Sequence, residues 1–386
     1  MSGANHANEG VICPPATLAV IGGGQLARMF IQAAQRMVYR TGVLTTDVDA
    51  PAAQIAHWSI VGEPNDLEAL RSLTNRAEAV TVEFENIQAA ALRLIARQVP
   101  TRPGGHSLWV CQNRIREKNF LDRHAIPIAP WRPVRNEHEL CSVISALGLP
   151  IVLKTAASGY DGKGQVRVER AGDLGSAWES LGRVACVAEA WVEFTAEASV
   201  VAVRGRDGKA ATYPLAWNQH TRHILDSTLM PAACGPVIAR EASATALAAA
   251  EALGHVGILT VEYFLKSDGR LLVNEMAPRP HNSGHLTIEA GVASQFDQQV
   301  RALCGLPLAP CRLIRPAAMV NLLGDLWRNG EPRWEAALAA DPAVSIHLYG
   351  KDAAVAGRKM GHLTVLDSTP EEALARAHAA RRRLVE

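Results

Sequence analysis

Two glutamates placed symmetrically about a turn signal are the first residues of this chain whose types and spacing suggest chemistry. Asp268-Gly269 favours a two-residue hairpin turn, and β-forming residues flank it. Such a turn places Glu262 opposite Glu275, with Cβ atoms about 4.5–5.5 Å apart, where like charges destabilise a sheet. The pair either shares a proton or holds a cation, and Mg²⁺ prefers carboxylates together with substrate phosphates. With Asn274 as a further oxygen ligand, the pattern predicts a magnesium site; the alternative is an exposed pair screened by water.

A glycine-rich loop, GYDGKGQ at residues 159–165, follows Lys154 and joins two expected strands. A Walker-type loop opens a helix, so this loop is of another kind. A glycine flap between strands, with a lysine just upstream, suits a triphosphate whose charge also needs Mg²⁺. Together with the paired carboxylates the flap predicts ATP chemistry; the alternative is a mobile surface hairpin.

Another glycine run, GGG at residues 22–24, follows an expected strand and opens an expected helix, as in the dinucleotide-binding fingerprint. Asp47 ends the next expected strand, where a ribose-binding carboxylate is sought. Backbone N–H groups at a helix N-terminus attract phosphate or another anion. The run therefore predicts an anion site, and leaves open a NAD or flavin dehydrogenase and a purely structural tight turn.

The elements that position these residues follow two patterns. Strands and helices alternate in the N-terminal part, which predicts a doubly wound parallel sheet, and paired strands dominate beyond Pro103. The expected strands are 17–21, 42–46, 79–82, 151–154, 165–168, 187–192, 198–203, 257–265, 270–275, 345–349 and 362–366; the expected helices are 25–38, 66–76, 114–124, 243–253 and a C-terminal one.

The C-terminal helix carries start and stop signals. Ser368 or Thr369 caps it, Pro370 and two glutamates follow, and arginines 381–383 end it, as the helix dipole favours. We interpret the arginine run as a solvated helix end and not as a binding patch.

Composition excludes several classes of protein. A chain of 386 residues predicts two or three domains, and 48% hydrophobic with 20% charged residues is typical of soluble globular proteins. A net charge of +1 gives no reason to expect nucleic acid or an anionic membrane, and no apolar run reaches the roughly 20 residues of a membrane span. Seven cysteines without a C-x-x-C pair argue against a disulfide framework or structural zinc, so we expect a cytoplasmic protein.

The order of motifs along the chain matches a known family. They are IGGGQLARM (21–29), VEFENI (82–87), REKNFL (116–121), GYDGKGQ (159–165), VNEMAPRPHNSGH (273–285), AAMVNLLGD (317–325), YGK (349–351) and GRKMGH (357–362). Through them the chain resembles the N5-carboxyaminoimidazole ribonucleotide synthetases, ATP-grasp enzymes of purine synthesis, from about residue 18 to residue 366. GYDGKGQ followed by APRPHNSGH is highly specific for this family.

The resemblance implies an ATP-grasp fold of α/β class with α+β lobes. We expect a flexible tail at 1–15, an N-terminal Rossmann-like (preATP-grasp) domain at 16–108 with the doubly wound parallel sheet, and ATP-grasp central lobes at 109–300. The small flap lobe is expected at about 125–190 and a small C-terminal domain at 301–386. A homodimer is expected from the resemblance alone.

ATP is implied between the two central lobes. Arg114 and Lys154 would contact its phosphates, Glu197 its ribose, and Glu262 with Glu275 would bind Mg²⁺, with Mn²⁺ as an alternative metal. The implied ATP-binding residues are Arg114, Lys154, Gly159, Tyr160, Asp161, Gly162, Lys163, Gly164, Gln165, Glu189, Ala190, Trp191, Val192, Glu197, His220, Asn274 and Glu275.

A site for 5-aminoimidazole ribonucleotide is implied where the three domains meet. Its residues are Gln25, Leu26, Glu83, Tyr160, Arg279, His281, Asn282, Ser283, Lys351 and Arg358. Lys351 and Arg358 would hold the phosphate, since a phosphate monoester needs two cations or backbone donors; without the resemblance they read as a solvated basic loop. Glu83 and Glu85 are close alternatives for substrate contact. His281 and His285 are four residues apart, but flanking prolines and a missing third ligand argue against zinc.

The reaction that the resemblance implies starts with attack of bicarbonate on the γ-phosphate of ATP, giving carboxyphosphate and ADP. Carboxyphosphate then yields CO₂, which the amine of the aminoimidazole attacks. Asp161 would orient and deprotonate that amine, and Arg279, His281 and Lys351 complete the expected catalytic set.

Some positions depart from the family pattern. Ala27 replaces a usual glycine, Asn113 a usual aspartate, residues 156–158 lack arginines, and residues 218–223 lack the glycine before Ile224. These changes bear on substrate affinity more than on reaction type. The rivals are an ATP-grasp ligase of the formate-dependent glycinamide ribonucleotide transformylase type, a dinucleotide-dependent oxidoreductase, and a catalytically silent nucleotide-binding protein.

Overall fold

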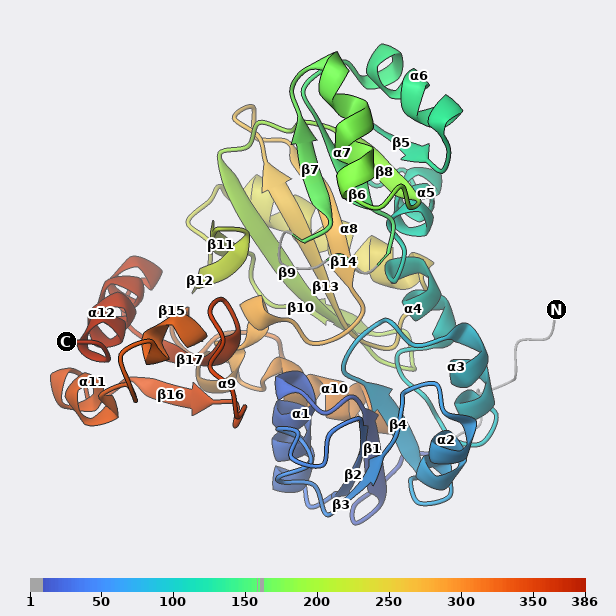
Figure 1. Cartoon of the computed structure of the whole chain (residues 1–386). Helices are drawn as coiled ribbons and strands as arrows, with labels where there is room; N and C mark the ends of the chain where they lie inside the picture. Colours follow the sequence, from blue (N-terminus) through green and yellow to red (C-terminus); the bar gives the residue numbers. More distant parts are fainter. Residues whose placement is uncertain (1–9, 158, 160–162) are drawn as a thin grey trace.

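The computed structural model describes residues 10–157, 159 and 163–386, which form three β-sheets with helices packed against them (Figure 1). The α/β class that the sequence predicts is confirmed. Among these residues, no helix combines the length and apolar character that a membrane crossing needs. All seven cysteines are free thiols.

The N-terminal sheet is parallel and carries helices on both faces, as expected. Its elements are β1 (Thr17–Ile21), α1 (Gln25–Arg36), β2 (Arg40–Thr45), β3 (Trp58–Val61), α2 (Leu67–Thr74), β4 (Ala79–Val82), α3 (Ala89–Ala96) and α4 (Gly105–Cys111), in strand order β3-β2-β1-β4; α10 (Gln295–Cys304) joins them from the later chain. Successive residues of a strand point to opposite faces. Leu18 and Val20 accordingly pack with α1 and α10, whereas Ala19 and Ile21 pack with α2, α3 and α4.

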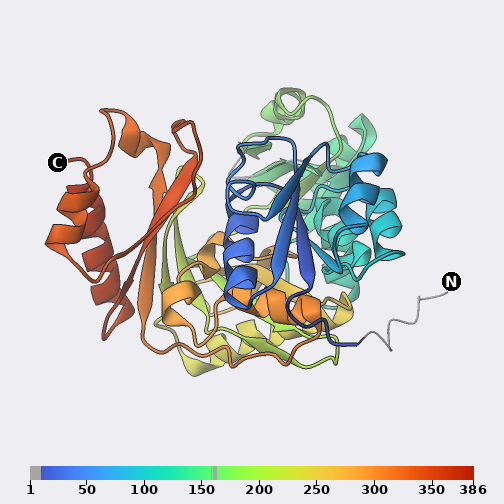
Figure 2. The same cartoon turned by 90° about the horizontal axis from the view of Figure 1, so that it is seen from below.

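Strand β3 is absent from the sequence prediction. It lies at the sheet edge, and its four residues alternate between half-buried and exposed, so it has only a short and weak apolar pattern. Figure 2 shows α10 lying against the N-terminal sheet, where the Gln299 amide donates to the Thr81 hydroxyl at 3.0 Å.

The small lobe is an antiparallel sheet in the order β5-β8-β6-β7. Helices α6 and α7 share one apolar core with this sheet, in the green part of Figure 1. The elements are α5 (Arg114–Arg123), which precedes the lobe, β5 (Trp131–Val134), α6 (Glu137–Leu147), β6 (Ile151–Thr155), β7 (Gln165–Val168), α7 (Leu174–Ser180) and β8 (Cys186–Ala190).

The third sheet has nine strands and runs from the centre of the molecule into the C-terminal region, in the order β14-β13-β9-β11-β12-β15-β17-β16 with β10 beside β9. Its elements are β9 (Ala196–Arg204), β10 (Ala210–Thr212), β11 (Ala216–Thr221), β12 (Ile224–Met230), α8 (Pro236–Ala252), β13 (Gly257–Leu265), β14 (Leu271–Ala277), α9 (Thr287–Ala290), β15 (Ala317–Leu323), α11 (Trp334–Ala340), β16 (Ser345–Leu348), β17 (Lys359–Leu366) and α12 (Pro370–Arg383). Pairing of β12 with β15 makes the C-terminal strands continuous with the central lobe.

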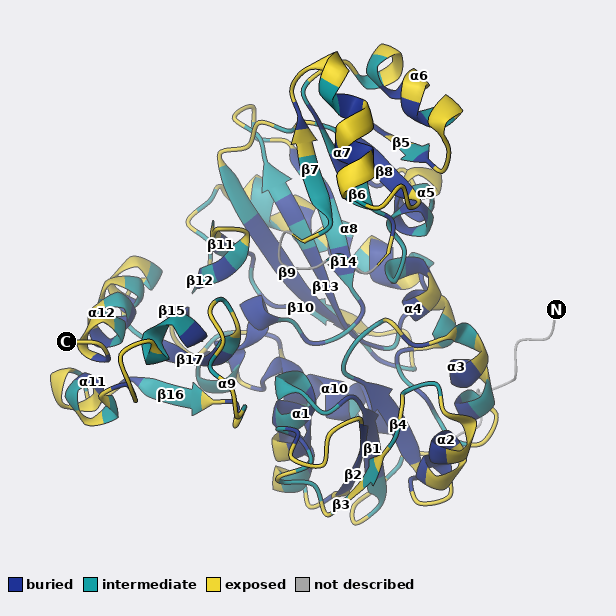
Figure 3. Ribbon diagram, viewed as in Figure 1, coloured by how far each residue is buried: buried dark blue, intermediate teal, exposed yellow. Residues whose placement is uncertain are grey.

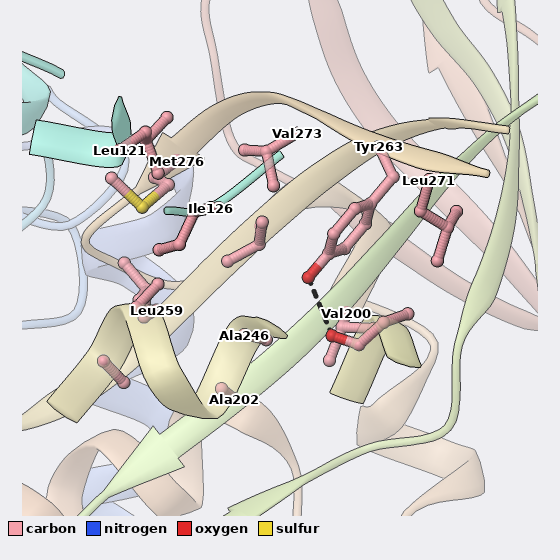
Figure 4. Packing of buried hydrophobic residues seen from close by; sticks show 14 of the residues in the cluster. Leu121, Ile126, Val200, Ala202, Ala246, Leu259, Tyr263, Leu271, Val273 and Met276 are labelled. Carbon is pink, nitrogen blue, oxygen red and sulfur yellow. Dashed lines mark hydrogen bonds between the residues drawn. The ribbon is translucent and has the colours of Figure 1, made fainter. Parts of the chain in front are cut away.

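The main core lies between this sheet and helix α8 (Figure 3). The alanine face of α8 packs on β9 and β13, and the buried Tyr263 hydroxyl donates to the Ala242 carbonyl at 2.8 Å (Figure 4). Leu121 of α5 and Met276 of β14 lie together in the same core.

The C-terminal helix begins as predicted and ends differently. The Thr369 hydroxyl accepts the Glu372 N–H at 3.2 Å, and Pro370 is the first helical residue. The prediction of a solvated arginine end is wrong for Arg381, because its guanidinium pairs with Asp226 on β12 at 2.7 Å. Arg383, with 59% of its side chain exposed, fits that prediction.

Candidate active site

The hairpin of β13 and β14 brings Glu262 opposite Glu275, as predicted, but by another route. The loop has three residues and not two, because Lys266 and Arg270 close it through N–H donation from Lys266 to the Arg270 carbonyl at 3.0 Å. Tyr263 then pairs with Val273, and a bulge between this pair and the next restores the pairing of the two glutamates. The pairing is confirmed; the two-residue turn is wrong.

Two cavities meet at the two glutamates. The larger, about 700 Å³, lies between the small lobe and the nine-stranded sheet, and the smaller, about 360 Å³, lies toward the N-terminal sheet. Of the described residues, six line both cavities: Arg114, Glu262, Glu275, His281, Asn282 and Lys359. A molecule in one cavity therefore faces a molecule in the other across a wall of charged and polar groups, which we call the shared wall.

The larger cavity collects nearly every described residue that the resemblance implies for ATP. These are Arg114, Lys154, Lys163, Gly164, Gln165, Glu189, Ala190, Trp191, Val192, Glu197, His220, Asn274 and Glu275. Gly159 lines the smaller cavity instead, and Tyr160, Asp161 and Gly162 lie outside the described residues.

A buried charge cluster stands at the base of the larger cavity. The Lys154 ammonium lies 3.1 Å from one Glu189 carboxylate oxygen, and the Lys118 ammonium lies 3.5 Å from the other. Burial acts to raise the pKa of Glu189, but Lys118 and Lys154 outweigh it and hold that pKa at about 2. Two lysines around one carboxylate leave a net positive charge, which suits a phosphate.

Glu197 and His220 form a second pair in the larger cavity. His220 Nδ1 lies 2.8 Å from a Glu197 carboxylate oxygen. Burial acts to lower the pKa of His220, but the hydrogen bond and the charge of Glu197 raise it. The pair holds the Glu197 carboxylate in a fixed direction at the cavity wall, where a hydroxyl-bearing ligand finds an acceptor.

Gln25, Leu26 and Glu83 line the smaller cavity. Two amides of the first glycine loop are occupied within the chain, because Glu83 accepts the Gly24 N–H at 2.5 Å and the Leu26 N–H at 3.1 Å. Burial raises the pKa of Glu83, against the opposing effect of these backbone donors. The side chain of Glu83 therefore occupies the N-terminus of α1, where the sequence predicts an anion.

Arg279 is held by Glu85, a neighbour of Glu83. Arg279 Nε lies 2.8 Å from a Glu85 carboxylate oxygen, and both side chains line the smaller cavity. Burial acts to raise the pKa of Glu85, but the charge of Arg279 lowers it. Glu83 serves the glycine loop and Glu85 serves Arg279, so the two close neighbours have different partners.

His281 links the glutamate pair to the loop after β14. Its Nε2 lies 3.0 Å from Glu262 and its Nδ1 lies 2.9 Å from the Ser283 hydroxyl. Burial acts to raise the pKa of Glu262, but the charge of His281 lowers it. Ser283 is fully buried and bonds Ser199 at 2.8 Å, so it supports His281 from behind the cavity surface. The Asn282 amide is buried without a protein partner among the described residues and lines both cavities, so it remains available to a ligand.

Lys351 and Arg358 do not line either cavity among the described residues. The Lys351 ammonium donates to the Lys359 carbonyl at 2.7 Å, and Arg358 donates to the Ala353 carbonyl at 2.9 Å. Lys359, which the sequence analysis does not single out, lies in the shared wall. Lys359 belongs to the GRKMGH motif, so the motif indicated this segment of the chain but not this particular residue.

Two further charged residues are absent from the predicted site residues: Glu117 and Lys118. Glu117 and Lys118 belong to the REKNFL motif and to the helix expected at residues 114–124. In the structure both are buried, with 2% and 1% of the residue exposed. Buried charges are rare unless paired, so these two residues serve the site or its frame.

The glutamate pair fits the magnesium that the fold implies. Glu262 and Glu275 are hard oxygen donors, and the Asn274 side-chain oxygen lies nearby, 3.4 Å from the Lys154 ammonium. No cluster of three or more His, Cys, Asp or Glu residues suited to a metal occurs in the described part of the chain.

Family models match three successive parts of the chain. Residues 16–112 match the ribonucleotide synthetase preATP-grasp domain, residues 119–296 match the ATP-grasp domain, and residues 317–376 match the phosphoribosylaminoimidazole carboxylase C-terminal domain. The chain is thus an ATP-grasp protein with the three-part order that the sequence motifs indicate.

Single relatives agree with the family models. The N5-carboxyaminoimidazole ribonucleotide synthase of Bacillus subtilis is 40% identical over 362 residues, which is 94% of each chain. The Staphylococcus aureus N5-carboxyaminoimidazole synthetase complexed with ADP superposes with a TM-score of 0.90 at 35% identity, covering 98% of this chain and 100% of that one. The Aspergillus clavatus N5-carboxyaminoimidazole synthase in complex with ADP and 5-aminoimidazole ribonucleotide gives a TM-score of 0.87 at 32% identity, covering 96% and 98%. The chain belongs to the N5-carboxyaminoimidazole ribonucleotide synthase family of ATP-grasp ligases.

Proposed function

We propose that this protein uses ATP and bicarbonate to carboxylate the amine of 5-aminoimidazole ribonucleotide, forming N5-carboxyaminoimidazole ribonucleotide in purine biosynthesis. The observation that carries the proposal is the shared wall: two cavities meet at a carboxylate pair flanked by Arg114 and Lys359. A ligase that joins a nucleotide-activated group to a second substrate needs this arrangement, with one substrate on each side of the reacting centre.

The larger cavity suits ATP. Lys154, Arg114 and the net positive cluster around Glu189 provide charge for the phosphates, and Glu197 provides an acceptor for the ribose hydroxyls. Trp191 and Phe194 are part-exposed aromatic side chains on the same cavity and offer apolar surface to adenine. Glu262 and Glu275 would hold Mg²⁺, or Mn²⁺ in its place, which when bound neutralises phosphate charge.

The smaller cavity suits the ribonucleotide. Arg279, His281 and the unpartnered Asn282 amide face it, and Gln25 and Leu26 close it on the side of the N-terminal sheet. For the phosphate we propose Lys351 and Arg358, which the resemblance implies, together with Lys359, which already lines the cavity. If residues 351–358 close toward the smaller cavity when the ribonucleotide binds, Lys351 and Arg358 would contact its phosphate.

The proposed reaction needs positioning and charge neutralisation more than covalent help from the protein. A bicarbonate oxygen attacks the γ-phosphorus of ATP, the bond to the ADP oxygen breaks, and carboxyphosphate forms beside Arg114 and Lys154. Cleavage of its C–O bond releases CO₂ and phosphate at the shared wall. The ribonucleotide amine attacks CO₂, and Asp161 takes the amine proton; Arg279 and His281 stabilise the carboxylated product. Asp161 lies outside the described residues, so its role is a prediction from the resemblance.

The homodimer and the cytoplasmic location expected from the resemblance also stand as proposals. Sedimentation of the purified protein tests the first, and fractionation of cells that express it tests the second.

ADP release from Mg-ATP and bicarbonate, with and without 5-aminoimidazole ribonucleotide, tests the proposed reaction. We expect release that depends on both bicarbonate and the ribonucleotide. Release only with glycinamide ribonucleotide and formate would keep the fold and overturn the substrate. Lys154→Met should lower turnover by roughly 100-fold, because it removes a cation from the phosphate site; Arg170→Ala, whose side chain is 81% exposed on the small lobe, is the matched control and should change nothing.

A further inference from the structure

Helix α5 holds the edge of strand β14 on both sides of Glu275. β14 is the last strand of its sheet and has β13 as neighbour, so its outward backbone groups need partners from other elements. The Lys118 ammonium donates to the Asn274 carbonyl at 2.9 Å, and the Met276 N–H donates to a Glu117 carboxylate oxygen at 2.7 Å. The two partners are consecutive residues of α5.

These contacts fall at the bulge of the hairpin. Tyr263 pairs with Val273 and Glu262 pairs with Glu275, so Asn274 is the extra residue. Without the bulge, Glu262 would pair with Asn274. A slip of one residue turns every following side chain to the other face of a sheet. The bulge therefore decides that Glu275 stands on the same face as Glu262 and not among the apolar residues of the opposite face.

The side chains of Glu117 and Lys118 are almost completely buried. Glu117 is 2% exposed and Lys118 is 1% exposed, and Leu121 of the same helix packs in the apolar core beside Met276 (Figure 4). Lys118 also lies 3.5 Å from Glu189 on β8, so it joins the bulge to the small lobe. Partners that direct the ligands of a metal, without touching it, influence metal affinity strongly.

We propose that Glu117 and Lys118 are positioning residues of the metal site: they fix the bulge at Asn274 and so hold Glu275 opposite Glu262. The inference rests on the proposed function, because the metal site belongs to it. Glu117 and Lys118 act through the backbone of β14 and are not ligands themselves.

Mn²⁺ binding to the enzyme–ADP complex, followed by the electron paramagnetic resonance signal of free Mn²⁺, tests the proposal without any turnover. Glu117→Leu removes the acceptor for Met276, and Lys118→Met removes the donor to Asn274. We expect each to weaken Mn²⁺ binding about 10–100-fold, the range typical of such supporting residues. Glu117→Gln keeps an acceptor oxygen and should stay within about threefold of wild type. The assay contains no ribonucleotide, so contact of Glu117 with that substrate cannot contribute.

Leu121→Ala is the matched control, because it lies on the same helix, is fully buried, and makes no polar contact with β14 among the described residues. It should lower stability and leave Mn²⁺ affinity within about threefold of wild type. Circular dichroism at the assay temperature verifies folding; if one polar variant does not fold, the other carries the test.

Unchanged Mn²⁺ affinity in a folded Glu117→Leu or Lys118→Met protein would overturn the positioning role, and so would an equal loss in Leu121→Ala. Absence of Mn²⁺ binding by the wild-type ADP complex, with Glu275→Gln as reference, would instead overturn the proposed metal site itself. ADP affinity measured with a chelator present separates loss of metal from loss of nucleotide.

Discussion

Replacing Glu83 by alanine tests how this chain uses its first glycine loop. In the structure the Glu83 carboxylate accepts the N–H groups of Gly24 and Leu26 at the start of α1. Glu83→Ala leaves both amides without their acceptor. A buried donor without a partner costs about 1–3 kcal/mol, so two donors cost about 2–6 kcal/mol. Water entering from the smaller cavity would restore part of this, and we expect a net loss of roughly 2–4 kcal/mol.

Urea unfolding followed by circular dichroism measures this loss. Glu83→Gln keeps one acceptor oxygen but turns an NH₂ group toward the second amide, so about half of the loss should remain. Gln88→Ala is the control, since this exposed side chain makes no capping bond to helix α3, and it should stay within about 0.5 kcal/mol of wild type. ADP affinity should change little, because Glu83 lines the smaller cavity and the nucleotide is assigned to the larger one.

Unfolding free energies of wild type and Glu83→Ala that agree within about 0.5 kcal/mol would refute this reasoning. The loop would then keep its shape without the carboxylate, and its amides would be free for a ligand anion. Tight binding of NAD or a flavin by the folded Glu83→Ala protein, and not by wild type, would show that only Glu83 separates the loop from a dinucleotide site.

Two further predictions concern single histidines. Burial lowers the pKa of His255 to about 4. As pH falls, the unfolded chain therefore binds a proton at this histidine before the folded chain does, and stability is lost between about pH 6.5 and 4, by at most roughly 3 kcal/mol. His255→Gln should flatten this part of the pH profile of urea unfolding, and an unchanged slope would contradict the prediction. His223 follows Arg222 in the two-residue turn between β11 and β12, and both have positive φ, 64° at His223 and 52° at Arg222. His223→Gly should raise the unfolding free energy by about 1 kcal/mol, since glycine adopts this backbone without strain. A lower melting temperature of the variant would contradict this prediction.

Local pattern predicted the elements that carry most of the site. The strands around Lys154 and Glu262 and the N-terminal strands β1, β2 and β4 have apolar patterns, and the structure contains them. Strand β3 has no such pattern because its residues are half-buried or exposed, and pairing with β2 defines it. Sequence periodicity detects burial, and it fails where an element is held by neighbours instead.

The hairpin shows a second limit. The position of Asp268-Gly269 predicts the right pairing of Glu262 and Glu275 from the wrong turn. The three-residue loop shifts the register by one residue, and the bulge at Asn274 shifts it back. Nothing in the two strands signals the bulge, since its partners Glu117 and Lys118 lie more than 150 residues away along the chain. Register in a strand is thus set partly by side chains that no local pattern contains.

The shared wall explains why the C-terminal region cannot be an independent module. Arg114 begins α5, Glu262 and Glu275 stand on the hairpin, His281 and Asn282 follow it, and Lys359 begins β17. β17 reaches this place only because β15 pairs with β12 and β17 pairs with β15, so the nine-stranded sheet must be complete before Lys359 can face the glutamates. A chain ending before β15 would keep the glutamate pair but lose the lysine from both cavities. The continuous sheet therefore determines where Lys359 lies relative to Glu262 and Glu275.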